Sequence, residues 1–411
     1  MIENQRIIES LKEIVDCNPK KTAIICEDES VTFSEFYDRV EKYCAQICEN
    51  GKRVMFIENE RCIETIAKIY ACVKAGCRYR IVNDMSEVDE KAEIEKDKDN
   101  ILYERKTSGT TGEKKLIFRR AEDFTRFIFE NYVERYEIAA TDVILNQLDF
   151  SFDAAAKDIF AMAISGATLV IGNREKMNYP VEFIKIVDTY NVTVFQTTPF
   201  FIKNMAKLNA FDEMVPSGLK KVLFVGDILK SEYLNYWIER MPETIFINQY
   251  GVSEYAGNLL DNIINEPVQS EYVTLKNQIV PISIDENGQI VVMNNLATRD
   301  MAKYCDADNS EICILGRMDN VRKIRGYRIS LEEIEREISS AFSGINALCE
   351  IQDDEVYVLC EATAMLDDKQ LKRELKDKLP FYCKPIHVKL VNSLPVNNNG
   401  KLDRKKISTF F

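Results

Sequence analysis

Two kinds of apolar pattern alternate along most of the chain. Short β-branched runs bounded by turn residues predict buried strands, and they occur at 167–172, 192–198, 221–227 and 244–251. Amphipathic stretches between and beside these runs predict helices, for example over 180–191 and 231–241. Apolar strands that alternate with helices are typical of an α/β protein whose largely parallel sheets are covered on both faces. In such proteins, ligands lie beyond the carboxyl ends of the strands.

The pattern changes in three places. Near the N-terminus it predicts a helix over 7–16, paired strands within 22–33, a strand over 53–58 and a helix over 62–76 that ends at Gly76. Residues 84–100 are almost all charged, and we interpret them as a solvated helix or loop. From about Tyr272 the pattern turns to short strands, and a capped helix begins at Ser330. We therefore place a domain boundary near Met318, with a large domain over 1–317 and a small one over 318–411.

The composition limits the functional classes. With 411 residues and a formal net charge of -13, the chain has room for two cores and is a poor nucleic-acid binder. From Arg317 onward, 17 basic and 15 acidic residues give +2, which leaves -15 for the rest. Such a segment suits an acidic partner, and a solvated surface is an equally consistent interpretation. Twelve dispersed cysteines, no signal peptide and no bilayer-length apolar run predict a cytoplasmic protein that does not enter the membrane.

A polar, glycine-containing loop is the first candidate for chemistry. The segment 106–115 reads KTSGTTGEKK and follows a strand-like run. Gly109 and Gly112 permit conformations in which backbone N–H groups converge on an anion, and hydroxyl groups and lysines surround them. The spacing of the two glycines differs from that in the P-loop of nucleoside triphosphatases. On its own, the loop is equally consistent with phosphate binding and with a polar turn.

Other motifs in the chain favour phosphate binding by this loop, because together they resemble those of a known family. The loop resembles the phosphate-binding signature of the adenylate-forming superfamily, although Lys114 and Leu116 replace its usual Pro and final Gly. VTFSEF, VKAGCRYRIV, QYGVSEYAG, the hinge-like GRMDNVRKIRGYRISLEEIE, LPFYCKP and LPVNNNGKLDR follow in the family's order. The family implies a large domain of helix-covered, largely parallel sheets with a small barrel-like β subdomain, followed by a small mobile α+β C-terminal domain. Amino-acid adenylation domains of nonribosomal peptide synthetases and D-alanine–carrier protein ligases are the members that this chain resembles.

The resemblance also implies the parts of an ATP site. Lys401 would bridge the substrate carboxylate and the α-phosphate as the catalytic residue, and Glu254 would bind Mg²⁺. Ser253 would donate to the α-phosphate, and Tyr250 would stack on adenine. The full set of expected ATP- or AMP-binding residues is Thr107, Ser108, Gly109, Thr110, Thr111, Gly112, Lys115, Gly226, Asp227, Asn248, Tyr250, Gly251, Ser253, Asp306 and Arg317.

Two of these assignments concern the end of the large domain. Asp306 would accept hydrogen bonds from the ribose hydroxyls, although its motif is degraded and Asp308 is a rival. Arg317 would contact ribose or phosphate. Asp319 would be the hinge about which the small domain rotates between adenylation and thiol transfer. A polar linker residue without such a motion is the simpler alternative for Asp319.

The substrate would be an amino acid, by resemblance to a Phe-Asp pair in which Asp binds the α-ammonium. Asp153 holds that place, and a buried carboxylate favours a cationic ligand; a helix-capping Asp is the alternative. If Lys157 faces the pocket, an acidic side chain fits, so we expect a polar or acidic amino acid, with D-alanine as an alternative. The carried-over pocket is Asp153, Ala154, Lys157, Gln196, Leu223, Val225, Gln249, Gly257 and Asn258.

The chain is also shorter than typical members. The compressed segment from Asn83 to Thr107 indicates lost strand-helix material in the first subdomain, and no carrier domain follows the closing motif. We therefore expect an AMP-forming amino-acid ligase that uses ATP and Mg²⁺ and transfers the acyl group to the phosphopantetheine thiol of a separate carrier protein. An acyl-CoA or aryl-CoA ligase and a non-catalytic nucleotide-binding homologue are the alternatives.

Overall fold

A computed structural model describes most of the chain as two compact units. Unit 1 comprises Met1–Arg105, Leu116–Thr298 and Ala302–Leu315, and unit 2 comprises Lys106–Lys115, Arg299–Met301 and Gly316–Phe411. The described residues are 3–51, 53–88, 100–107, 115–292, 296–317, 321–325, 327–331, 334–335, 337–338, 342, 345–362, 369, 371–373, 375, 379, 381–395 and 402–411.

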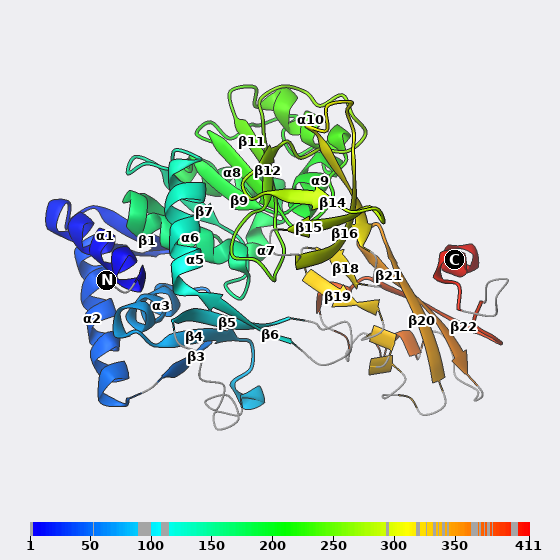
Figure 1. The fold of residues 1–411 in the computed structure, drawn as a ribbon, viewed down its shortest axis with the longest axis horizontal. Coiled ribbons are helices and arrows are strands. Elements are labelled where there is room, and N and C mark those ends of the chain that lie inside the picture. Colours follow the sequence, from blue (N-terminus) through cyan, green and yellow to red (C-terminus); the bar gives the residue numbers. More distant parts are fainter. Residues whose placement is uncertain are drawn as a thin grey trace. The chain divides into compact units, whose positions relative to one another are not determined.

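A nine-stranded sheet forms the centre of unit 1 (Figure 1). Its strands lie in the order β13-β12-β11-β10-β9-β7-β8-β1-β2. Neighbouring strands from β11 to β1 pair in parallel, whereas β12, β13 and β2 add antiparallel edges. The bounds are β1 Thr22–Cys26, β2 Glu29–Thr32, β7 Val143–Asn146, β8 Thr168–Ile171, β9 Val194–Thr197, β10 Lys221–Val225, β11 Ile245–Tyr250, β12 Leu260–Ile264 and β13 Asn277–Gln278.

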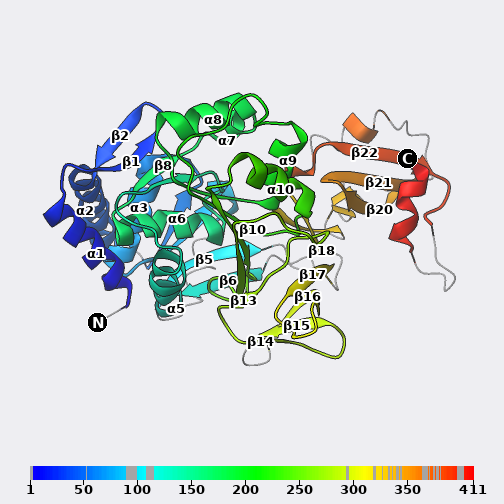
Figure 2. The same cartoon turned by 90° about the horizontal axis from the view of Figure 1, so that it is seen from above.

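Helices cover both faces of this sheet, because consecutive strand residues point to opposite sides and both sides are apolar. In β7, Ile144 packs into the core cluster that contains α1, α2, α3, α5 and α6, and Leu145 packs into the cluster of α7, α8, α9 and α10. Figure 2 shows these two groups of helices on opposite sides of the sheet. The bounds are α1 Glu3–Cys17, α2 Phe33–Glu49, α3 Ile63–Ala75, α5 Ala121–Ile128, α6 Asp153–Ser165, α7 Arg174–Met177, α8 Pro180–Thr189, α9 Pro199–Lys207 and α10 Ser231–Arg240.

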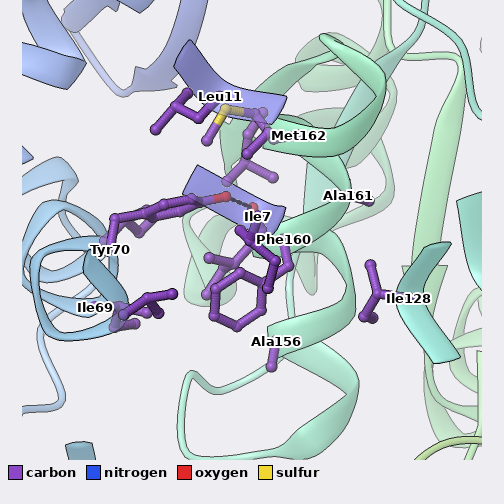
Figure 3. Close-up of a cluster of buried hydrophobic side chains, with 14 of the residues drawn as sticks. Ile7, Leu11, Ile69, Tyr70, Ile128, Ala156, Phe160, Ala161 and Met162 are labelled. Atoms are coloured by element: carbon purple, nitrogen blue, oxygen red, sulfur yellow. Dashed lines mark hydrogen bonds between the residues drawn. The ribbon is translucent and has the colours of Figure 1, made fainter. Parts of the chain in front are cut away.

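A second sheet packs against the helical layer of α1, α2, α3, α5 and α6, on the side away from the nine-stranded sheet. Its order is β3-β4-β5-β6, with bounds β3 Val54–Glu58, β4 Arg78–Val82, β5 Ile101–Thr107 and β6 Lys115–Arg120. Tyr70 of α3 and Phe160 of α6 lie in the layer between the sheets, and the Tyr70 hydroxyl donates to the carbonyl of Ile159 at 2.7 Å (Figure 3). This layer positions α6, whose N-terminus carries several predicted site residues.

A third sheet completes the folded body before the C-terminal segment. Its strands, in the order β14-β15-β16-β17, are β14 Ile282–Ile284, β15 Gln289–Val292, β16 Leu296–Tyr304 and β17 Ile312–Arg317. Leu260, Ile290 and Ile312 are buried in a small core of their own. This sheet is the small β subdomain that the resemblance implied.

Unit 2 has a separate core around a three-stranded sheet. The sheet order is β20-β21-β22, with a hairpin of β18 and β19 beside it in sequence. The bounds are β18 Val321–Ile324, β19 Tyr327–Ser330, β20 Ile345–Gln352, β21 Glu355–Ala362 and β22 Ile386–Val391, and a short 3-10 helix spans Arg404–Phe410. Ile334, Val356 and Leu371 are among its buried apolar side chains.

The observed architecture confirms the predicted α/β fold and most of the predicted elements. The helix predicted over 62–76 is α3, and Gly76 ends it with a φ of 66°, in the left-handed region that favours glycine. The four apolar runs are β8, β9, β10 and β11. Residues 89–99 of the charged run, the helix-or-loop prediction for them, and the hinge at Asp319 lie outside the described residues.

Candidate adenylation site

The predicted substrate-binding residues gather where parallel strands end. Gln196 is on β9, Leu223 and Val225 are on β10, and Gln249 is on β11. The register pairs Gln196 with Leu223 and Val225 with Gln249, so these residues lie at the same carboxyl edge of the sheet. Helix α6, which begins at Asp153, crosses the same face. The fold thus brings this set together where α/β proteins bind ligands.

A hydrogen-bond network joins most of this set. The Lys157 ammonium donates to Gln249 Oε1 at 3.0 Å and to Asn258 Oδ1 at 2.8 Å. Gln196 Nε2 donates to the carbonyl of Ala154 at 2.6 Å, and Gln196 Oε1 accepts from the Tyr132 hydroxyl at 2.6 Å. Lys157 therefore does face the other predicted pocket residues, which the sequence left open.

The charges within this network are deeply buried. Lys157 is 4% exposed, and burial lowers the pKa of its ammonium to about 8. Asp158 is fully buried, and burial raises the pKa of its carboxyl group to about 7, although Asn146 and Tyr132 donate to it at 2.9 Å. Among the described residues, the Lys157 ammonium has two neutral acceptors and no carboxylate within 4.0 Å. Lys157 consequently has no direct ionic partner among the described residues, although the Asp158 carboxyl group belongs to the same network.

Asp153 is already paired with protein cations. Its carboxylate accepts from Arg119, lies 3.1 Å from Arg105 Nη2, and accepts from the Tyr103 hydroxyl at 2.8 Å. Burial would raise the pKa of this carboxyl group, but the two guanidinium groups hold it below its ordinary value. The sequence argument that a buried Asp153 requires a cationic ligand is therefore weakened, because the chain itself supplies two cations.

Arg119 connects Asp153 to the loop after β11. Its Nη2 also donates to the carbonyl oxygen of Ser253 at 2.7 Å, and the residue is 2% exposed. Asp153 occupies the first turn of α6, where the helix dipole favours a negative charge, and Phe152 before it provides no side-chain cap. One guanidinium thus fixes strand β6, the start of α6 and the loop of Ser253 to one another.

Gly257 allows the aromatic ring of Phe127 to pack against the backbone beside this network. A Cβ atom built at Gly257 would lie 2.3 Å from the Phe127 ring, and the φ of 103° is one that other residues rarely adopt. The Phe127 ring in turn lies 5.9 Å from the Lys157 ammonium. Glycine at this position is therefore required by both the backbone and the close approach of the ring.

The predicted nucleotide-binding residues of unit 1 cluster near the same edge. Asn248 and Tyr250 are on β11, and Gly251 and Ser253 follow directly. Gly226, at a φ of 119°, follows β10 with open space beside it, and Asp227 follows Gly226. Asn248 Nδ2 donates to the Thr274 carbonyl at 3.3 Å, and the Asp227 carboxylate accepts from the backbone of Ile228 at 2.8 Å.

Glu254, the expected magnesium ligand, is exposed on the same loop. The described residues contain no group of three or more His, Cys, Asp or Glu that would hold a metal by themselves. A magnesium site that shares one protein carboxylate with nucleotide phosphates does not need such a group, because Mg²⁺ retains waters and takes phosphate oxygens. The donor set therefore fits the expected ion.

Asp306 organises a turn. Its carboxylate accepts from the backbone of Glu311 at 2.8 Å and from the Ser310 hydroxyl at 2.5 Å, and these hydrogen bonds lower its pKa to about 2. In unit 2, Arg317 Nη1 lies 2.8 Å from Asp300 Oδ1. The ribose contacts assigned to both residues stay predictions.

Several predicted residues lie outside the described part of the chain. These are Lys401, Asp319 and the loop residues Ser108, Gly109, Thr110, Thr111 and Gly112. The backbones of Thr107 and Lys115 belong to β5 and β6, and their side chains are likewise outside the description.

Several polar residues of the site were not predicted, among them Arg105, Arg119, Tyr132 and Asp158. Arg105 and Arg119 flank the phosphate loop in strands for which the family's motif assigns no role. Tyr132 lies in a π-helix over Phe129–Glu134, and Asp158 follows Lys157 on α6. Charged residues in otherwise apolar strand runs were the available signal for the arginines.

The comparison with protein families identifies a domain within the chain. Residues 86–278 match the family of AMP-binding enzymes. These residues therefore form an AMP-binding domain of the adenylate-forming superfamily, as the motifs indicated.

Particular relatives are similar to the chain over almost its whole length. A D-alanine–D-alanyl carrier protein ligase of Staphylococcus aureus is 24% identical over 479 aligned positions, which cover 98% of each chain. The Vibrio cholerae adenylation domain AlmE, solved with glycyl-adenosine-5'-phosphate, superposes with a TM-score of 0.81 at 16% identity over 98% of each chain. PA1221, a nonribosomal peptide synthetase protein with adenylation and carrier domains, gives 0.78 at 18% identity over 98% of this chain and 84% of that one.

Two further findings bear on the sequence predictions. The alignment with the ligase extends over more positions than the 411 residues of this chain, so it contains gaps on this side. Within the residues that the structure describes, every helix is too short or too polar to cross a membrane.

Proposed function

We propose that this protein activates an amino acid with ATP. The substrate carboxylate attacks the α-phosphorus, its oxygen bonds to phosphorus, and pyrophosphate leaves, which gives an aminoacyl-AMP. The thiolate of a phosphopantetheine group then attacks the acyl carbon and expels AMP. The observation that carries this proposal is the convergence of the predicted substrate residues on α6, β9, β10 and β11 at one edge of the sheet.

The chemistry requires positive charge where two anions meet. Lys401 would bridge the carboxylate and the α-phosphate, and Glu254 would hold Mg²⁺, which neutralises phosphate charge when bound. The loop that begins after Thr107 would hold the β- and γ-phosphates, and Tyr250 would stack on adenine. The domain assignment of 1–317 and 318–411, and rotation about Asp319 between the two half-reactions, belong to the same proposal.

The acyl acceptor would be a carrier protein on another chain. The named Staphylococcus aureus relative acts on a carrier protein, and PA1221 joins an adenylation domain to a carrier domain. The segment from Arg317 onward carries a small positive charge on an otherwise acidic protein, which would help it to dock an acidic carrier.

The substrate that the charges favour is a polar or acidic amino acid. The Lys157 ammonium is buried against two neutral acceptors, and a carboxylate on the substrate would supply the missing countercharge. A small amino acid such as D-alanine is the second candidate, because the pocket side chains Lys157, Gln196, Gln249 and Asn258 are almost fully buried against one another. The named relatives of this chain support the second candidate.

Pyrophosphate exchange against all amino acids, including the D-enantiomers, tests the proposal. We expect exchange with aspartate or glutamate if the Lys157 charge determines the specificity. If the close packing of the pocket side chains determines it, we expect exchange with D-alanine or glycine. Lys401→Ala should abolish exchange while ATP still binds, since the lysine acts on the transition state. Exchange that is unchanged in this variant would disprove the assigned role.

The same assay separates the alternatives. Exchange with fatty or aromatic acids and with no amino acid would support an acyl-CoA or aryl-CoA ligase, for which Asp153 paired with Arg105 and Arg119 would be purely structural. ATP binding without any exchange would support a non-catalytic homologue.

A further inference from the structure

Arg119 lies between the two halves of the candidate site. Its guanidinium contacts Asp153, the residue expected to bind the substrate ammonium, and the carbonyl of Ser253, the residue expected to contact the α-phosphate. All three residues belong to unit 1. A buried cation at this position therefore lies beside the place where the carboxylate and the α-phosphorus would react.

The charges around Arg119 do not balance. Two guanidinium groups, those of Arg105 and Arg119, face the single carboxylate of Asp153. Arg119 Nε is buried and has no hydrogen-bond acceptor among the described residues. A buried N–H without a partner is costly, and an excess positive charge in a buried site favours an anion. Among the described residues, the cluster therefore carries one more cation than anion.

The hydrogen bond to Asp153 fixes the orientation of the Arg119 guanidinium. Arg119 Nη2 donates two hydrogen bonds, one to Asp153 and one to the carbonyl of Ser253. If the Asp153 bond is released, the Ser253 bond still holds the guanidinium beside the loop of Ser253 and Glu254. The remaining N–H groups would then be able to meet an oxyanion there.

We propose that Arg119 is an anion-binding residue of the adenylation site, and that Asp153 holds it in reserve until the substrate ammonium takes its place. This inference rests on the proposed function. When the ammonium binds Asp153, a third cation joins the carboxylate, and like-charge repulsion favours departure of Arg119. The freed guanidinium contacts the α-phosphate, whose oxygens gain negative charge in the transition state. Binding of the amino acid thereby increases the affinity of the site for ATP.

The test measures ATP affinity without any amino acid. Titration calorimetry with Mg-ATP compares the wild-type protein with Asp153→Asn, which removes the charge that holds Arg119. We expect the variant to bind ATP about tenfold more tightly, because a charge-assisted hydrogen bond to phosphate becomes available. A purely structural Asp153 predicts the opposite sign, weaker binding in a loosened site.

Two further variants make the result specific. Arg119→Met alone should bind ATP like the wild type, and Asp153→Asn combined with Arg119→Met should lose the tenfold gain. Asp212→Asn, which removes the carboxylate partner of Arg240 on α10, is the matched control and should leave ATP affinity unchanged. Thermal unfolding of each variant verifies that it is folded, and Asp153→Ser replaces a variant that is not.

Two outcomes overturn the proposal. Either Asp153→Asn binds ATP no more tightly than the wild type, or the gain persists after Arg119 is replaced. Both leave the adenylation proposal intact, since pyrophosphate exchange tests that separately. A wild-type protein that binds no ATP would overturn both proposals together.

Discussion

The buried Lys157 predicts a measurable pH dependence of stability. Its pKa is lowered from 10.5 to about 8 by burial, so the unfolded chain binds the proton more tightly than the folded protein does. The charged lysine therefore costs roughly 3 kcal/mol of stability at pH 7, and this cost falls as the pH rises from 8 toward 10.5. Between pH 7 and pH 9 the free energy of unfolding should rise by about 1 kcal/mol through this group alone.

Lys157→Met removes the titrating group but not its surroundings. The variant avoids the cost of burying the ammonium, and it leaves Gln249 Oε1 and Asn258 Oδ1 without their donor, at about 1–3 kcal/mol each. These effects oppose each other, so at pH 7 the variant should lie between about 1 kcal/mol more stable and about 3 kcal/mol less stable than the wild type.

Chemical denaturation of both proteins at several pH values between 7 and 9 provides the assay. Titrating groups remote from Lys157 cancel in the difference between wild type and variant. The pKa of Asp158, which the Lys157 charge lowers, rises further in the variant and adds to the difference in the same direction. The difference should therefore change by at least about 1 kcal/mol in favour of the wild type as the pH rises. Parallel curves would refute the reasoning, because they would show that Lys157 keeps an ordinary pKa in the folded protein.

Three other substitutions test separate parts of the structure. Gly257→Ala should lower stability by roughly 1–3 kcal/mol and reduce exchange, because the added methyl group meets the Phe127 ring at an unfavourable φ; Phe127→Ala in the same chain should restore part of both. Trp237→Ala should cost about 3–5 kcal/mol in urea unfolding, since Trp237 is the largest fully buried side chain. Glu335→Gln should weaken the pair with Arg404 and lower the unfolding temperature of unit 2 while leaving ATP binding in place.

The fold could be predicted because its signals are local. Runs such as 192–198 and 221–227 carry apolar residues at consecutive positions, as strands covered on both faces do, and they contain β9 and β10. Gly76 ended a periodic pattern, and it ends α3. These features depend on a few neighbouring residues, so periodicity and turn chemistry were sufficient to find them.

The partners of the site residues could not be predicted in the same way. Arg119 and Asp153 are separated by 34 residues, and Lys157 and Asn258 by 101. No local pattern states which buried cation meets which carboxylate, because the packing of α6 between two sheets decides it. The motif located Asp153 in the sequence, and only the structure showed that two arginines face it.

The ion pairs of Asp153 bear both on the amino-acid assignment and on the role of Arg119. A carboxylate without a partner would by itself have argued for a cationic ligand, whereas one paired with Arg105 and Arg119 does not. An amino acid remains a suitable substrate if its ammonium either competes with Arg119 for Asp153 or binds beside Arg119. The competition has a use if the displaced guanidinium then binds phosphate. The amino-acid assignment and the role of Arg119 therefore support each other through Asp153. Exchange with amino acids together with an unchanged ATP affinity in Asp153→Asn would mean that the ammonium is accommodated beside Arg119 rather than in its place.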